Sequence, residues 1–348
     1  MTPNDDGFES RGALGTFAVL TAMVSAGQTL LGRFLLLEEI GRGGMSTVFK
    51  ARDLQEGDLC AVKVALPQFS SGVGSWSMSQ REAEIGLGLR HPTLLRFRPL
   101  PAGRARNVIV TEYVSGPTLA SRIGGRPLGE TEAIRIARIL CEAVEYLHSQ
   151  RIVHYDVKPN NIILCDDGSL RLIDFGVAHG LEESRLGLAG QAPPVATADY
   201  AAPEQIRRRR GQRSVDIYAI GAVLYEMLTG HPPFEGDDPF AVASAREIGD
   251  PKAPRALNPQ ISAEVEEIVL KTLRRRPEDR YPTVTDLRAD LEHPAQVRVS
   301  GLAAHLIVPT GWRKAVRWAR YITLVGIVPV VSLVALFLVL WWRMSRAR

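Results

Sequence analysis

The feature that most constrains this chain is a polar motif between residues 154 and 176. Asp156, Lys158 and Asn161 follow the order Asp-x-Lys-x-x-Asn, and Asp174 comes 13 positions after the asparagine, at the start of Asp-Phe-Gly. Asp156 can accept the proton of an attacking hydroxyl, and Lys158 can neutralise charge on a moving phosphoryl group. Asn161 and Asp174 offer oxygen ligands to Mg²⁺, with Mn²⁺ as the alternative metal. A polar loop before a strand is the competing interpretation, but the order and spacing favour phosphoryl transfer.

A glycine-rich segment upstream supports this interpretation. It consists of Ile40, Gly41, Arg42, Gly43, Gly44, Met45, Ser46, Thr47 and Val48. Glycines let backbone N–H groups approach phosphate oxygens, although an isolated β-hairpin turn needs the same residues. Lys63 favours the phosphate interpretation, because it lies in an apolar strand-like segment, where an ammonium group needs anionic partners. Glu82, in a helical-looking segment, is one candidate partner, and bound phosphates are the other.

In their order along the chain, these motifs resemble those of the eukaryotic-like serine/threonine protein kinases of bacteria. The similarity covers residues 27–293 and includes Ala202-Pro203-Glu204. The resemblance implies that this last segment shapes a groove for protein substrates, so it is the predicted substrate-binding segment. The resemblance implies an α+β protein with the two-lobed protein kinase fold. A small β-rich N-lobe would span residues 27–113 and a large helical C-lobe residues 114–293, with ATP between them.

The resemblance also implies an adenine site. Thr111 would be the gatekeeper, and the backbone of Glu112 and Val114 would bond the edge of the adenine. Three side chains would sandwich the ring, namely Val48, Ala61 and Ile163.

Further roles follow from the same resemblance. Glu204 would pair with Arg280, and Asp216 would brace the catalytic loop. Thr197 resembles the family's threonine that bonds the catalytic base, so it joins the predicted catalytic residues, with a surface threonine as the alternative. Lys158, two residues after the base, favours serine/threonine over tyrosine specificity.

Two helices are predicted in the large lobe. Apolar residues recur at steps of three and four between residues 131 and 149, which is typical of an amphipathic helix. Residues 217–228 are apolar on almost all sides, which predicts a buried helix.

The C-terminal part predicts a membrane anchor. Residues 321–342 carry no charge, and as a helix they would be about 33 Å long, against roughly 30 Å for the hydrocarbon core of a bilayer. We therefore expect a single transmembrane helix at 321–342, a basic juxtamembrane spacer at 294–320 and a short basic tail at 343–348. Because ATP is cytoplasmic, we expect the kinase domain on the cytoplasmic side of the bacterial inner membrane. Residues 1–26 are expected to be a disordered extension.

The formal net charge of +4 comes from the C-terminal end. Seven basic residues and no acidic residues follow position 312, so the rest of the chain has slightly more acidic than basic residues. This distribution gives no indication of a nucleic-acid partner, and it favours contact of the spacer with anionic lipids. The expected partners are protein substrates with serine or threonine, and a homodimer is left open.

Two positions depart from the family pattern, and one of them is Ser46, which stands at the third glycine position of the glycine-rich segment. Tyr155 stands where many kinases carry arginine, just before the base. A membrane-anchored pseudokinase that binds nucleotide as a scaffold is therefore the alternative function. Because every charged and metal-binding position is filled, we favour an active, non-specific protein serine/threonine kinase.

Overall fold

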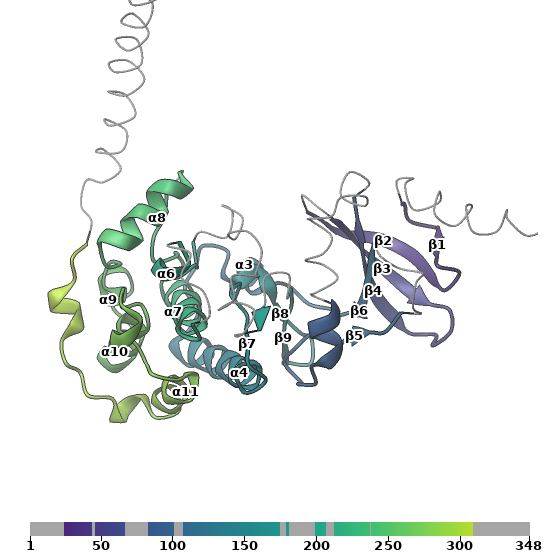
Figure 1. The fold of residues 1–348 in the computed structure, drawn as a ribbon. Coiled ribbons are helices and arrows are strands. Elements are labelled where there is room, and N and C mark those ends of the chain that lie inside the picture. The colour runs from purple at the N-terminus through teal and green to yellow at the C-terminus, as the bar shows by residue number, and fades with distance from the viewer. Residues whose placement is uncertain are drawn as a thin grey trace, which may run out of the picture.

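The computed structural model describes residues 24–43, 46–66, 83–100, 107–174, 179–180, 199–206, 212–236 and 238–308. These residues form a β-sheet at the N-terminal end and a group of helices at the C-terminal end (Figure 1). The predicted division into a small β-rich lobe and a large helical lobe is confirmed. Residues 1–23 of the predicted extension 1–26, and the predicted segments 321–342 and 343–348, lie outside the described residues. Val24 of that extension packs against the core of the small lobe.

The sheet of the small lobe is antiparallel and has the strand order β1-β2-β3-β4-β6-β5. Its strands are β1 (Thr29–Leu30), β2 (Phe34–Arg42), β3 (Ser46–Asp53), β4 (Leu59–Ala65), β5 (Phe97–Arg98) and β6 (Val108–Glu112). In β4, Cys60, Val62 and Val64 are buried in the core of the lobe. Since side chains alternate along a strand, Lys63 lies on the opposite face, toward the large lobe.

The large lobe is built around two helices. Its helices are α3 (Leu119–Ile123), α4 (Glu130–Ser149), α6 (Pro203–Ile206), α7 (Ser214–Thr229), α8 (Pro239–Ile248), α9 (Pro254–Leu257), α10 (Ala263–Thr272) and α11 (Val284–Glu292). Both predicted helices are confirmed, because α4 buries one face and α7 is buried almost throughout. The packing of α7 on α10 needs Gly221, since a Cβ there would lie 2.1 Å from Thr272 Oγ1.

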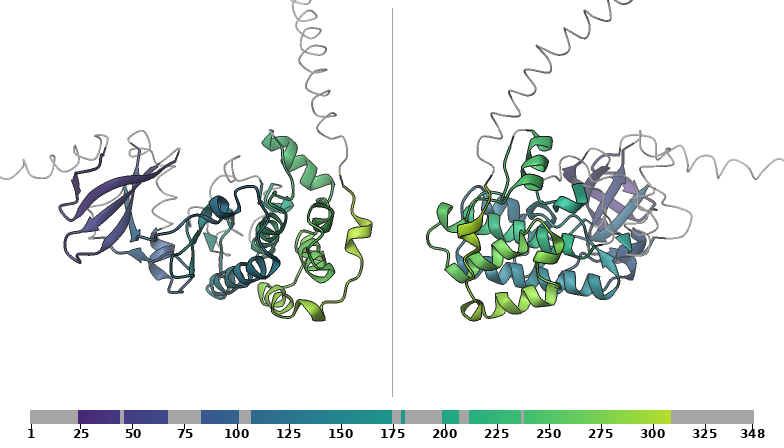
Figure 2. Two further views of the ribbon diagram at one scale, coloured as in Figure 1. Left: turned by 180° about the vertical axis from the view of Figure 1, so that it is seen from behind. Right: turned by 60° about the vertical axis from the view of Figure 1, so that its left-hand side comes forward.

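Short strands carry the catalytic segment between the two lobes (Figures 1 and 2). β7 (Ile152–Val153) pairs with β10 (His179–Gly180), and β8 (Ile162–Leu164) pairs with β9 (Leu170–Leu172). The 3₁₀ helix η3 (Pro159–Asn161) precedes β8 directly. The catalytic motif therefore occupies the turn between β7 and β8, where both ends are held by strand pairing.

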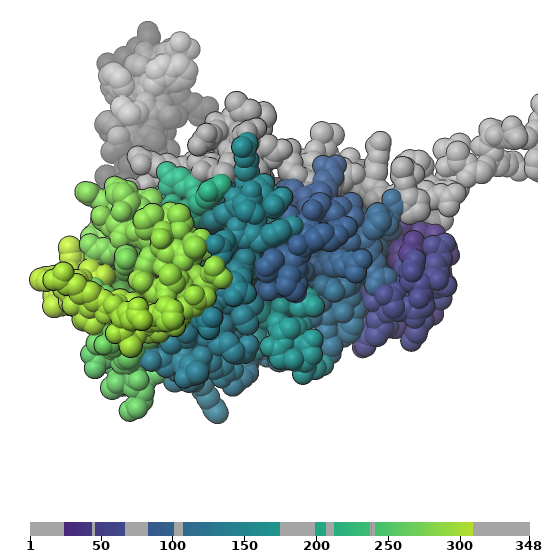
Figure 3. Space-filling model, turned by 90° about the horizontal axis from the view of Figure 1, so that it is seen from below, coloured from purple at the N-terminus to yellow at the C-terminus, as the bar shows by residue number. Residues whose placement is uncertain are grey.

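Residues 294–308, the C-terminal strap, follow α11 and include η6 (Pro294–Gln296) and η7 (Leu302–His305). Glu267 of α10 accepts hydrogen bonds from the N–H groups of Ser300 (3.1 Å) and Leu302 (3.2 Å). Asp250 and Ile307 exchange two bonds, of 2.8 and 2.9 Å. The described part of the predicted spacer therefore lies against the large lobe, at the end opposite the N-terminal strands (Figure 3).

The described residues contain no helix that is long and apolar enough to cross a membrane.

Candidate functional site

Asp216, in the first turn of α7, holds the chain just before the predicted base. Its Oδ2 accepts a hydrogen bond from the His154 N–H (2.9 Å) and lies 2.9 Å from His148 Nε2, while Oδ1 accepts from the Tyr155 N–H (2.8 Å). Burial opposes ionisation of this carboxyl, but the bond with His148 brings its pKa below the ordinary value. The predicted bracing of the catalytic loop by Asp216 is confirmed.

Tyr155 takes part in this support through its backbone. Its φ of 65° lies in the left-handed region, which a bulky residue adopts only when the surrounding structure holds it there. Its N–H is bound by Asp216, and its carbonyl accepts a hydrogen bond from Gln205 Nε2 at 3.1 Å. These two bonds do not depend on the side chain at position 155, so the departure from arginine leaves the loop geometry supported.

Asp156 is the centre of the site. Its Oδ2 accepts hydrogen bonds from Lys158 Nζ (2.8 Å) and Asn161 Nδ2 (2.9 Å). Its Oδ1 is buried and has no hydrogen-bond partner among the residues that the structure describes. Burial raises the pKa of this carboxyl above the ordinary value, and Lys158 opposes that rise. The arrangement leaves one carboxylate oxygen available to accept a proton from a substrate hydroxyl.

Asn161 and Asp174 supply oxygen atoms next to this carboxylate. Asn161 donates its amide N–H groups to Asp156, so its amide oxygen is the atom left for a cation. The Asn161 carbonyl accepts a hydrogen bond from the Ile173 N–H at 2.8 Å. This bond holds the backbone directly before Asp174, whose φ is 70°. Lys63 Nζ lies 3.9 Å from Asp174 Oδ1, so the two lobes meet at this point.

The donor set fits magnesium bound together with phosphates. The described residues contain no group of three or more His, Cys, Asp or Glu side chains that could hold a metal. Mg²⁺ usually binds one or two carboxylates plus water and substrate phosphates, rather than an all-protein cage. One carboxylate and one amide oxygen beside a lysine match that requirement.

The predicted adenine-site residues lie on both sides of the connection between the lobes. Ala61 is paired with Thr111 across β4 and β6, and Val48 of β3 is paired with Lys63. Ile163 lies in β8 of the large lobe, where it bridges to Thr118. The backbone that follows Glu112 and Val114 passes close to β8.

Gly116 makes that close passage possible, and sequence reasoning missed it. Its φ is 138°, and a Cβ at this position would lie 1.9 Å from the Leu164 carbonyl oxygen. Only glycine therefore fits between the hinge and β8. The available signal was a Gly-Pro pair directly after the hinge.

The glycine-rich segment forms the connection between β2 and β3. Ile40, Gly41 and Arg42 belong to β2, while Ser46, Thr47 and Val48 belong to β3. The Gly43 N–H donates to the Ser46 carbonyl at 2.8 Å. Register shifts in β2 at Leu36/Glu38 and Glu39/Gly41 bend the strand just before this turn.

Four predicted site residues lie outside the described residues. They are Gly44, Met45, Glu82 and Thr197. The predicted partnership of Lys63 with Glu82 stays a prediction.

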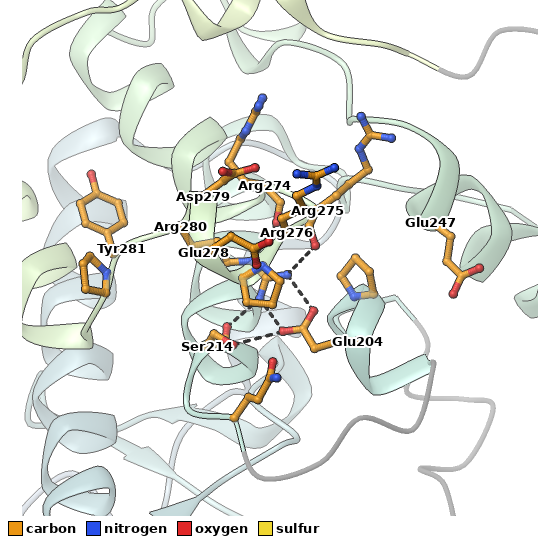
Figure 4. Close-up of a pocket in the computed structure, with 14 residues that line it drawn as sticks. Glu204, Ser214, Glu247, Arg274, Arg275, Arg276, Glu278, Asp279, Arg280 and Tyr281 are labelled. Carbon is orange, nitrogen blue, oxygen red and sulfur yellow. Dashed lines mark hydrogen bonds and ion pairs between the residues drawn. The ribbon is translucent and has the colours of Figure 1, made fainter.

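The predicted pair of Glu204 and Arg280 is confirmed. Arg280 Nη1 and Nη2 bind the two carboxylate oxygens at 2.6 and 2.8 Å, and both side chains are buried. The pair holds α6, in the predicted substrate-binding segment, against the chain before α11. A cavity of about 940 Å³ adjoins it, with Arg274, Arg275 and Arg276 in its lining (Figure 4).

Two further residues that hold the predicted substrate-binding segment in place were not themselves predicted. Gln205 Oε1 accepts from the Ala202 N–H at 2.7 Å, in addition to the bond from its amide to Tyr155. Arg246 of α8 is fully buried and donates from Nη1 to the Ala201 carbonyl at 2.5 Å. Polar residues on short helices are common, so their sequence positions carried no signal.

Comparison with known proteins agrees with this geometry. The family model described as protein kinase domain matches residues 34–292. Serine/threonine-protein kinase PknB of Mycobacterium tuberculosis H37Rv is 37% identical over 268 residues, which cover 75% of this chain and 43% of that protein. PknB of Mycolicibacterium smegmatis is 36% identical over 269 residues, covering 76% and 43%. Probable serine/threonine-protein kinase SCO3848 of Streptomyces coelicolor is 35% identical over 266 residues, covering 75% and 40%. The chain thus matches less than half the length of these relatives.

Proposed function

The chain belongs to the protein kinase family, with bacterial serine/threonine kinases among its relatives, and from this premise we propose that it phosphorylates serine and threonine residues of proteins. The observation that carries the proposal is the environment of Asp156. Lys158 and Asn161 converge on one of its oxygens and leave the other without a partner among the described residues. A scaffold that only binds nucleotide has no need of such a carboxylate.

Each residue then has one task. Asp156 accepts the proton of the substrate hydroxyl at Oδ1. Lys158, held 2.8 Å from Oδ2, keeps the carboxylate oriented and adds positive charge beside the reacting group. Lys63 adds a second positive charge from the small lobe. Little covalent work falls to the side chains in phosphoryl transfer, so positioning and charge neutralisation account for most of the rate.

Bound Mg-ATP supplies the phosphoryl group and the cation that neutralises its charge. Asn161 and Asp174 would hold the cation, and the β2–β3 connection with Lys63 would hold the phosphates. The adenine would bind at the hinge between Thr111 and Val114. The metal is Mg²⁺ in this proposal, with Mn²⁺ as a substitute.

We further propose that residues 321–342 anchor the enzyme in the bacterial inner membrane, with the kinase domain in the cytoplasm. The support is the absence of charge over this stretch, together with the need for cytoplasmic ATP. Leu333→Arg combined with Leu336→Arg would place two charges at the centre of the span, at about 2.5–3.5 kcal/mol each. We expect this variant to leave the membrane fraction, whereas the wild type resists extraction with alkaline carbonate; equal retention of both would refute the anchor.

The activity is tested with the full chain in detergent, labelled ATP, Mg²⁺ and a generic protein acceptor. We expect label on serine and threonine, and a loss of about 10²–10⁴-fold in Asp156→Asn. Lys63→Met should also abolish transfer. The matched controls are Asp167→Asn, in an exposed turn, and Lys252→Met, at an exposed position of the large lobe; both should remain active.

Two outcomes would contradict the proposal. Nucleotide binding without any transfer would select the scaffold function. Transfer that survives in Asp156→Asn would remove Asp156 from the mechanism.

A further inference from the structure

Two exposed isoleucines, called the pair below, lie near the end of the C-terminal strap. Ile248, at the end of α8, and Ile307, at the end of the strap, are 59% and 61% exposed, the highest values among the large hydrophobic side chains that the structure describes. Asp250 links the two isoleucines, because it exchanges two hydrogen bonds with Ile307 and lies two residues after Ile248 in the sequence. The two isoleucines therefore belong to the same region of the surface, and exposed apolar surface rimmed by polar residues is typical of interaction sites.

Basic side chains border this pair. Arg275 donates from Nη1 to the Ile248 carbonyl at 3.0 Å, and its Nε lies 3.4 Å from Asp250 Oδ1. Arg274 and Arg276 flank it in the lining of the cavity, and Figure 4 shows Arg274 and Arg275 extending to the same side. The pair and these arginines form one edge of the large lobe.

Acidic side chains limit the positive charge of the cavity itself. Glu247, Glu278 and Asp279 also belong to its lining. The cavity therefore carries both signs of charge and does not define an anion site alone. The isoleucines are expected to contribute more than the arginines to any contact at this edge.

The course of the chain indicates what this edge faces. The strap is followed by residues 309–320 and then by the uncharged segment 321–342. Twelve residues reach at most about 40 Å when fully extended, and those at 313, 314, 317 and 320 are basic. A bilayer that held residues 321–342 would lie within this reach of Ile307.

We propose that the edge formed by Ile248, Ile307 and Arg274–Arg276, the docking edge, rests on the surface of an anionic lipid bilayer. The isoleucines enter the boundary between headgroups and acyl chains, and the arginines lie among the headgroups. The inference depends on the proposed membrane anchor. It adds an orientation, with the lobe held against the bilayer through α8 and the strap.

The test measures contact of the docking edge with lipid in the full chain. An environment-sensitive fluorophore is attached at Ile248→Cys, in a Cys165→Ser background, because Cys60 and Cys141 are fully buried. The matched control carries the label at Leu54→Cys, an exposed apolar position in the small lobe. Both are placed in nanodiscs of phosphatidylcholine and phosphatidylglycerol that contain an acyl-chain quencher.

We expect quenching of the label at position 248 and none at position 54. Ile307→Ser should reduce the quenching. Arg274→Gln and Arg276→Gln should each lower the ratio of docked to undocked protein by about fivefold in anionic nanodiscs, whereas Arg52→Gln, an exposed arginine of β3, should leave it unchanged.

Equal quenching at both positions would overturn the docking edge. Protection of the 248 label from an aqueous quencher without lipid quenching would also overturn it, because a protein would then cover the edge. Carbonate-resistant membrane association and kinase activity are measured on the same samples. If membrane association and kinase activity persist while lipid quenching is absent, the docking edge is refuted and the proposed function stands. If membrane association is lost, the proposed anchor is refuted, and the docking edge that depends on it is refuted as well.

Discussion

Replacing Arg280 with methionine tests how the large lobe holds α6. Arg280 donates two hydrogen bonds to Glu204 and others to the carbonyls of Ser214 (2.9 Å), Arg274 (2.7 Å) and Arg275 (3.2 Å). The side chain of Arg280 is 0% exposed and that of Glu204 is 5% exposed, so solvent screens neither charge. Breaking a buried pair by removing one partner costs about 3–5 kcal/mol, because the remaining charge is uncompensated.

The lost bonds to the three carbonyls add to this cost, and the apolar contacts of methionine offset part of it. We expect Arg280→Met to lower the free energy of unfolding by about 4 kcal/mol. Adding Glu204→Leu removes the isolated carboxylate, so the double variant should recover about 2 kcal/mol relative to Arg280→Met. If the free energy of unfolding rises when Glu204→Leu is added, the destabilisation by Arg280→Met comes from the isolated carboxylate and not from lost packing alone.

The assay is urea unfolding of the full chain in detergent, followed by far-ultraviolet circular dichroism. The matched control is Arg122→Met, at an exposed position of α3, where the ion pair with Glu132 at 3.2 Å is screened by water and should contribute less than about 1 kcal/mol. The reasoning is refuted if Arg280→Met costs no more than Arg122→Met. It is equally refuted if Glu204→Leu destabilises the Arg280→Met variant further.

Three more predictions concern the site and the core of the large lobe. Because burial raises the pKa of Asp156 and only the carboxylate accepts a proton, kcat/KM should begin to fall on acidification at a higher pH than an ordinary aspartate would cause; a pH–rate profile with an acid limb at the ordinary value would contradict this. The pKa of Asp216 is lowered in the folded state, so the stabilisation by its carboxylate is complete above the ordinary aspartate pKa and disappears as the pH falls through the lowered pKa. The loss of stability caused by Asp216→Asn, measured by urea midpoints, should therefore shrink over that pH range. A loss that stays constant with pH would contradict this prediction. Gly221→Ala would bring a Cβ to 2.1 Å from Thr272 Oγ1 and should cost about 1–3 kcal/mol; an unchanged unfolding midpoint would show that the two helices move apart freely.

The chemistry of the site could be predicted because its residues lie in short contiguous motifs. Asp156, Lys158 and Asn161 fall within six positions, so local chain geometry keeps them near one another, and the structure shows them bonded. The pairing of Glu204 with Arg280 spans 76 positions, and only the resemblance to a known family indicated it. No local pattern predicts which distant charges share a buried site.

Other contacts had no signal that sequence reasoning could use. Arg246 looks like an ordinary polar residue of an amphipathic helix, yet it is fully buried and binds the Ala201 carbonyl. Gly116 looks like a turn residue, yet its role is to admit the Leu164 carbonyl. In both cases the partner lies on a different segment of the large lobe, and its position depends on how the segments of that lobe pack.

The sequence by itself determined the family, the two-lobed fold and the identity of the charged groups around Asp156, because each depends on residue type and on spacing within one stretch of chain. Only the tertiary structure decided that residues 294–308 fold back onto the large lobe and bring Ile307 to Asp250. That contact rests on two hydrogen bonds between residues 57 positions apart, one between two backbone groups and one from the Ile307 N–H to the Asp250 carboxylate. Backbone N–H and carbonyl groups occur at almost every position, so only the folded path of the chain selects which ones meet.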